Sequence, residues 1–155
     1  MGFLYTSAVM FLFWLALSGQ FTGLLLASGA VAAGLVAALA RGGEPLPGPA
    51  FLLRLAAYLP WLFRQIALSN LDVAYRVLHP SRPIDPRVIK IKNPCRTPLG
   101  TALLANSITL TPGTVTLEAG PLELVVHAVS REAEADLLAG EMQARVLRVE
   151  GAADV

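Results

Sequence analysis

The stretch NSITLTPGT, residues 106–114, decides how the chain is interpreted. It combines an amide, several hydroxyls and a Pro-Gly pair, and it lies inside an uncharged run over 97–117. Three explanations are open for so many hydrogen-bonding side chains without an ion. The stretch could be a cation site, a membrane segment, or a compact turn in a small folded domain.

Composition indicates a membrane protein. Hydrophobic residues make up 55% of the 155 residues and charged residues only 15%, whereas about a quarter of an average soluble protein is charged. The charges are also uneven: residues 1–40 carry none, 41–96 carry nine Lys or Arg against three acids, and 118–155 carry eight acids against three Arg. The chain therefore has an apolar, a basic and an acidic third.

The apolar third predicts a transmembrane helical hairpin over residues 1–40. Two apolar segments, 3–17 and 21–40, flank the turn sequence Ser18-Gly19-Gln20, and about 20 helical residues cross a bilayer. A cleaved signal peptide is the alternative, but no Lys or Arg precedes the apolar run. The hairpin has no ionisable side chain, so we expect it to form no ion path alone.

Small residues at intervals of three or four form one stripe on the second apolar segment. Such stripes let helices approach closely in lipid. We expect the stripe to pack against other subunits, although Ala and Gly also make an ordinary apolar span. Its residues are Gly23, Ala27, Ala30, Gly34 and Ala38.

The basic middle, residues 41–83, predicts an amphipathic helix over 51–78 that Pro60 kinks or splits. A helix in the membrane interface is the favoured hypothesis, and a third span or a buried helix of a soluble domain are the alternatives. One sector is expected to be polar: Arg54, Gln65, Ser69, Asp72 and Arg76. The expected interface anchors are Arg41, Arg54, Tyr58, Trp61 and Arg64.

The basic residues also orient the hairpin. Lys and Arg favour the cytoplasmic side, so both termini and the tail are expected in the cytoplasm. These charges are spread over Pro-rich linkers and an apolar helix, and no nucleic-acid partner is expected.

The tail, 84–155, predicts a small α+β domain in the order β-α-β-β-α. Residues 86–92 alternate as a strand, 99–106 read as a short helix, and two strand patterns flank 119–121. Thr111 to Thr114 match a type II turn with Gly113 at the position that needs positive φ. Ser130 is a good N-cap, and acids at 132–136 followed by Arg145 and Arg148 suit one helix.

This domain favours the turn explanation for the opening stretch. Pro112 and Gly113 divide any membrane segment there, and neutral hydroxyls bind hard cations poorly without carboxylates or carbonyls. We therefore predict strand hydroxyls and a turn with a structural role, involving Asn106, Thr109, Thr111, Pro112, Gly113 and Thr114.

Catalytic and metal chemistry find little support. The single cysteine, Cys95, excludes an intramolecular disulfide and fits a reducing compartment. A nucleophile pair of Cys95 with His127 is conceivable, but nothing positions the two together. No metal motif, phosphate loop or cofactor motif is present, so we expect no catalytic residue, no metal and no cofactor.

The segments NSITLTPGTVTLE and LVVHAV resemble the signature of the E-type subunit of Mrp-type multisubunit cation/proton antiporters. LSNLDVAYRVLHP and the apolar N-terminus extend the resemblance over nearly the whole chain. The resemblance implies an accessory subunit of a prokaryotic plasma membrane complex that exchanges sodium for protons only with its large antiporter-like and small membrane partners. The competing hypotheses are a stand-alone membrane-anchored regulatory or ligand-binding module and a small membrane-bound enzyme.

Overall fold

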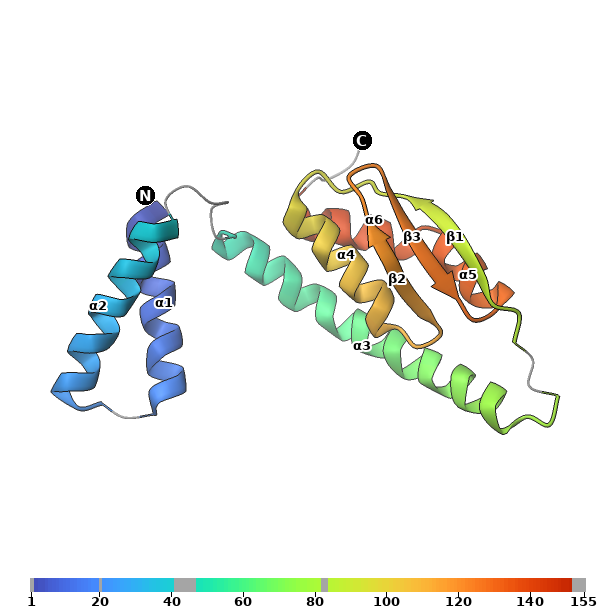
Figure 1. Ribbon diagram of the computed structural model, residues 1–155, viewed down its shortest axis with the longest axis horizontal. Coiled ribbons are helices and arrows are strands. Elements are labelled where there is room, and N and C mark those ends of the chain that lie inside the picture. The colour runs from blue at the N-terminus through green and yellow to red at the C-terminus, as the bar shows by residue number, and fades with distance from the viewer. Residues whose placement is uncertain (1, 20, 41–46, 82–83, 152–155) are drawn as a thin grey trace. The chain divides into compact units, whose positions relative to one another are not determined.

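The computed structural model describes residues 2–19, 21–40, 47–81 and 84–151. The chain divides into two compact units, residues 1–48 and 49–155, which are considered separately (Figure 1). The sequence analysis separated a segment over 41–83 from a tail over 84–155, whereas the structure groups residues 49–155 in one compact unit. The long helix packs on the tail and belongs to the same unit.

The first unit is a helical hairpin of α1 (Gly2–Ser18) and α2 (Gly23–Leu39). Gly19 follows α1 with φ of 58°, a conformation that glycine adopts without strain at a helix end. The Trp14 indole donates a hydrogen bond to the Leu25 carbonyl at 3.1 Å and so ties α1 to α2.

The two helices contact each other through a stripe that the sequence analysis did not select. Gly29, Ala33 and Ala37 are the buried residues of α2, and a Cβ at Gly29 would collide with the Trp14 indole. The predicted stripe lies on another side of α2 and is not buried by α1. Gly34 is half-buried, and the other four residues are exposed: Gly23, Ala27, Ala30 and Ala38.

The second unit begins with α3 (Pro49–Leu78) and continues as a small α+β fold. The three strands form an antiparallel sheet in the order β1-β3-β2, as Figure 1 shows. The other elements are β1 (Arg87–Lys92), α4 (Pro98–Leu110), β2 (Thr114–Ala119), β3 (Glu123–Ala128), α5 (Arg131–Leu138) and α6 (Glu141–Glu150).

One face of the sheet supplies the core. Leu124, Val126 and Ala128 alternate along β3 and are fully buried. They lie against α4 and α6, which contribute Leu104, Ile108, Val146 and Val149 to the core cluster. Tyr58 and Leu62 of α3 join the same cluster, so α3 is packed onto the domain.

Three expected elements differ from the structure. Helix α4 does not end at Asn106 but continues to Leu110, because Ser107 and Ile108 are buried against the core. The single helix expected after Ser130 is two, α5 and α6, because Gly140 adopts a left-handed φ of 77° between them. Helix α3 continues through Pro60 without splitting, since packing on both sides of the proline holds it.

Candidate functional site

The turn after α4 has the predicted geometry. Thr114 N–H donates to the Thr111 carbonyl at 3.2 Å, and Gly113 has φ of 94°. A Cβ on Gly113 would also lie 3.2 Å from Val129 Cγ1 and 3.6 Å from Val73 Cγ2. The turn therefore favours glycine through its positive φ, and the tight approach of Val129 adds to that preference, whereas the distance to Val73 on α3 is an ordinary contact.

The hydroxyls of the opening stretch close the C-terminus of α4. Thr111 Oγ1 donates to the Ser107 carbonyl at 2.9 Å, and Thr114 Oγ1 donates to the Ile108 carbonyl at 2.6 Å. The last carbonyls of a helix have no partner within the helix, so side chains that reach them stabilise its end. Both hydroxyls are thus used in hydrogen bonds within the helix end and the turn.

Asn106 lies on α4 as the expected helix over 99–106 requires, but Thr109 also lies on α4 and not on a strand, which corrects that expectation. Each side chain donates to a carbonyl four residues earlier, on Ala102 and Ala105 respectively. Thr109 Oγ1 also accepts from the Thr116 backbone N–H at 3.1 Å and connects α4 to β2. The stretch contributes to the structure as predicted, but from a helix end.

The N-terminus of α4 is held by a residue that the sequence analysis missed. Glu150, at the end of α6, accepts from the backbone N–H groups of Arg96 and Thr97 at 3.1 and 2.6 Å. Thr97 Oγ1 in turn accepts from the Gly100 N–H. A capping signal was visible in the Thr97-Pro98 pair, but no local pattern indicates a carboxylate more than fifty residues away.

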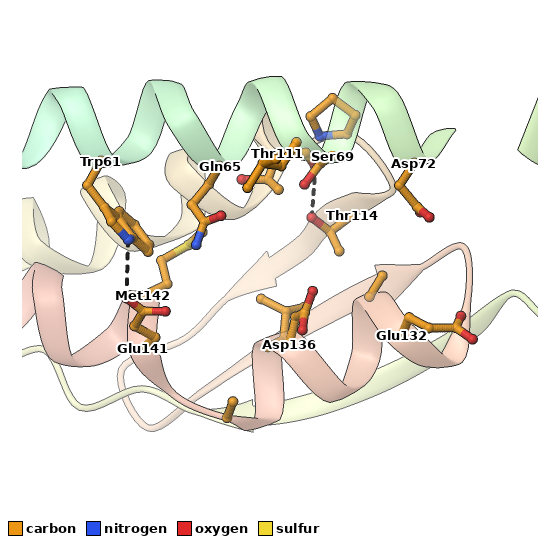
Figure 2. Close-up of a pocket in the computed structure, with 15 residues that line it drawn as sticks. Trp61, Gln65, Ser69, Asp72, Thr111, Thr114, Glu132, Asp136, Glu141 and Met142 are labelled. Atoms are coloured by element: carbon orange, nitrogen blue, oxygen red, sulfur yellow. Dashed lines mark hydrogen bonds between the residues drawn. The ribbon is translucent and has the colours of Figure 1, made fainter. Parts of the chain in front are cut away.

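A groove of about 440 Å³ lies between α3, the Thr111–Thr114 turn and the α5–α6 pair (Figure 2). Trp61 closes one end, where its indole N–H donates to Glu141 at 3.1 Å and Arg145 stacks 4.5 Å from the ring centroid. The polar side chains that line the groove include Gln65, Ser69, Asp72, Glu132, Asp136 and Glu141.

The other end of the groove is an ion-pair cluster that fixes α3 to α5. Buried Arg76 binds Asp72 at 2.6 and 3.0 Å and reaches Glu132 at 3.2 Å. The Glu132 backbone N–H, followed by the Ser130 hydroxyl, lowers the pKa of the Glu132 carboxyl. Among the described residues, no group of three or more His, Cys, Asp and Glu side chains could hold a metal ion.

Cys95 and His127 are not brought together. His127 is paired with Val88 near the start of β1, whereas Cys95 follows the end of β1 beyond Lys92. Four residue steps along the strand separate Val88 from Lys92 by about 13 Å. Burial, followed by the charge of Glu150, raises the pKa of the Cys95 thiol to about 11. This environment is the opposite of the one that activates a cysteine nucleophile.

The expected interface anchors on α3 lie in different environments. Tyr58 is only 4% exposed and belongs to the core, so it is not a surface anchor. Trp61 is bonded to α6, and the Arg54 guanidinium lies against Gly151. Arg64 is exposed, and Arg41 lies outside the described residues. The predicted polar sector of α3 exists, but much of it faces the α+β domain. Arg76 binds Glu132 of α5, and Gln65, Ser69 and Asp72 line the groove.

The opposite side of α3 is apolar and open. We call the residues Leu53, Phe63, Leu71, Tyr75, Val77 and Leu78 the outer face; each is at least 60% exposed. By length and composition α3 is, within the described part of the chain, the helix that could cross a membrane, while α1, α2 and α4 are shorter apolar helices.

The family model described as Na+/H+ ion antiporter subunit matches residues 7–149. The chain belongs to this family. The match includes both units and the whole 106–114 stretch.

An individual member of the antiporter subunit family agrees with this assignment. The E-type subunit of the Na(+)/H(+) antiporter of Alkalihalophilus pseudofirmus is 36% identical over 56 residues, which is 36% of this chain and 35% of that protein. The aligned segment thus spans about a third of the length of that relative.

Two solved structures are similar to this family member. A chain of the membrane-bound sulfane sulfur reductase, an archaeal respiratory membrane complex, is 37% identical with a TM-score of 0.70, and the match covers 83% of each chain. A chain of the Mrp complex from Dietzia sp. DQ12-45-1b is 30% identical over 66% of this chain and 98% of that chain, with a TM-score of 0.44. The first of these likenesses supports the fold.

Proposed function

We propose that the chain is an accessory subunit of a multisubunit sodium/proton antiporter, needed for assembly and activity but not transporting ions by itself. The family match over residues 7–149 carries this proposal. Its partners are then the other membrane subunits of the complex, both the large antiporter-like ones and the small ones.

The hairpin is proposed to be the membrane anchor. Helices α1 and α2 have 17 residues each and no charged side chain, which gives about 26 Å of helix against a hydrocarbon core of about 30 Å. A small thinning of the bilayer or the flanking apolar residues make up the difference. Two spans with basic residues beyond α2 favour a cytoplasmic location for both termini.

The surface of α2 that α1 leaves open supports a packing role. A Cβ at Gly23 or Gly34 would meet nothing within 4 Å, so a neighbouring helix has room to approach there. Small residues at such a surface allow close helix contacts in lipid, where van der Waals packing drives association.

The absence of charge in the hairpin sequence supports the accessory role. Ion and proton paths within membranes are normally built from ionisable side chains, and residues 1–40 have none. Those side chains must then come from partner subunits.

Affinity purification of the tagged chain from its native membrane tests the proposal. A subunit is expected to elute with other membrane proteins in fixed proportion, and deletion of the chain is expected to weaken sodium/proton antiport in membrane vesicles. Elution of the chain alone, with antiport unaffected by its deletion, would favour the stand-alone module instead.

A further inference from the structure

We propose that the outer face of α3 lies on the lipid bilayer surface, with the helix axis in the membrane plane. The inference rests on the proposed membrane anchoring of the hairpin and adds the surface by which the second unit meets the bilayer. Tyr58, Trp61 and Arg54 were expected to be interface anchors, but they lie on the side of α3 that faces the α+β domain.

Helix α3 cannot cross the bilayer while it stays docked on the α+β domain. Arg76 binds Glu132 at its C-terminal end, and Trp61 binds Glu141 nearer the other end. A spanning α3 would draw these charged partners into hydrocarbon, where each charged side chain is costly. One side of α3 is therefore committed to the domain and only the other is available to lipid.

The width of the apolar surface favours a bilayer over a single partner helix. At 100° per residue, the outer face spans about 160°, and α3 carries no acidic residue within that arc. A helix partner covers a narrower stripe, whereas an interfacial helix sinks about half of its circumference into the headgroup and acyl boundary. From Leu53 to Leu78 the outer face is about 38 Å long.

The charge on the outer face suits lipid headgroups. The exposed Arg64 lies within the arc near one edge, and the uncharged Asn70 is the other exposed polar residue there. The Arg64 guanidinium can reach lipid phosphates while its stem follows the apolar surface. A basic residue without an acidic neighbour in the arc matches an anionic bilayer surface.

The tether to the hairpin points to the same occupant. Nine residue steps join Ala40, after α2, to Pro49, at the start of α3. They extend at most about 32 Å, which limits how far the start of α3 could lie from a membrane-spanning α2 and is compatible with an interfacial α3.

Spin-label accessibility in the full chain tests the proposal. Single cysteines are introduced on the outer face as Leu53→Cys, Phe63→Cys and Leu71→Cys in a Cys95→Ser background. Matched controls at exposed positions elsewhere in the unit are Glu118→Cys on β2 and Ala135→Cys on α5. Each chain is placed in nanodiscs of phosphatidylethanolamine and phosphatidylglycerol, alone and within the purified complex. Unchanged circular dichroism and protease resistance qualify a variant for measurement.

The expected result is a several-fold higher ratio of oxygen to water-soluble nickel-chelate collisions at the three outer-face labels than at the two controls, in the isolated chain and in the complex. Adding Leu53→Gln and Leu71→Gln should reduce this ratio at the Phe63→Cys label, because the face loses apolar contact with lipid. Labels in water in both preparations would overturn the proposal.

Outer-face labels that become shielded from both oxygen and nickel only in the complex would also overturn it, since a partner subunit would then cover the face. Failure here is distinguishable from failure of the proposed function. A chain that purifies with its partners while its outer face stays in water remains a subunit whose second unit does not lie on the bilayer.

Discussion

At Gly113 the backbone and the packing demand the same residue. A side chain at φ of 94° is strained by roughly 1–2 kcal/mol, and Val129 leaves little space for a Cβ. We expect Gly113→Val to lower the thermal unfolding midpoint of the purified chain by roughly 2–8 °C, measured by circular dichroism in detergent, and to reduce the amount of assembled complex.

Thr109→Val is the matched change for Gly113→Val, because it removes one hydroxyl from the same stretch. The Thr109 hydroxyl donates to the Ala105 carbonyl and accepts from the Thr116 N–H, and both hydrogen bonds are exposed. Because one such hydrogen bond contributes about 1 kcal/mol, we expect a smaller decrease in the unfolding midpoint. A Gly113→Val chain that unfolded and assembled like the wild type while antiport disappeared would instead assign Gly113 to ion handling.

The reactivity of Cys95 should depend on folding and pH. Its pKa in the folded chain, about 11, lies above the value of about 8.5 for an unperturbed thiol, so the folded chain holds the thiol proton more tightly. Iodoacetamide should therefore modify the folded chain more slowly than the denatured chain at pH 8, and the gap should close as the pH approaches 11. The thiol's contribution to stability is present below the unfolded pKa and is lost as pH rises through the folded pKa. Equal rates at pH 8 would contradict this environment.

At the scale of elements, substitutions at two glycines of α2 distinguish the contact between α1 and α2 from the proposed contact with other subunits. Gly29→Leu should disrupt the α1–α2 contact, because Trp14 occupies the space, and should lower the abundance of the chain itself. Gly34→Leu should leave the isolated chain stable and reduce its recovery with partners, because a Cβ there meets nothing in the chain. Quantitative immunoblots of membranes and of the purified complex measure both effects. Normal assembly of the Gly34→Leu chain would argue against the proposed packing surface.

Sequence patterns were reliable where the determinant is local. The Pro112-Gly113 turn, the Ser130 cap, the β2–β3 hairpin and the existence of α3 all follow from neighbouring residues, and the structure confirms them. The predicted end of α4 was wrong. Asn106 favours turns and Thr109 favours strands, but burial of Ile108 overrides these local preferences and the helix continues to Leu110. The helix break at Gly140 was not predicted, although a glycine can end a helix. The acids before Gly140 and the arginines after it also suit the two ends of a single helix.

Contacts between distant residues were not predictable from the sequence. The polar sector of α3 was identified correctly, but a helical wheel does not say whether such a sector faces water or ion-pair partners in a later domain. Glu132 and Glu141 decide this, more than fifty residues beyond Arg76 and Trp61. For the same reason Tyr58 was assigned to the membrane surface when it packs in the core.

At the scale of the whole molecule, the chain combines an apolar hairpin without ionisable groups and an α+β unit onto which α3 is packed and held by Glu132 and Glu141. A cation path within a membrane is normally built from acids or lysines, and residues 1–40, the proposed membrane anchor, carry none. Its contribution to antiport is therefore expected to be assembly and positioning of other subunits.

Reconstitution of the purified chain alone tests this central claim most directly. The chain is placed in liposomes with an imposed pH gradient, and internal pH is followed by a fluorescent dye after sodium is added, with empty liposomes and the complete complex in parallel. The chain alone should give no sodium-dependent proton flux above empty liposomes, while the complex should give a clear signal. Sodium-dependent flux from the chain alone would contradict the accessory role.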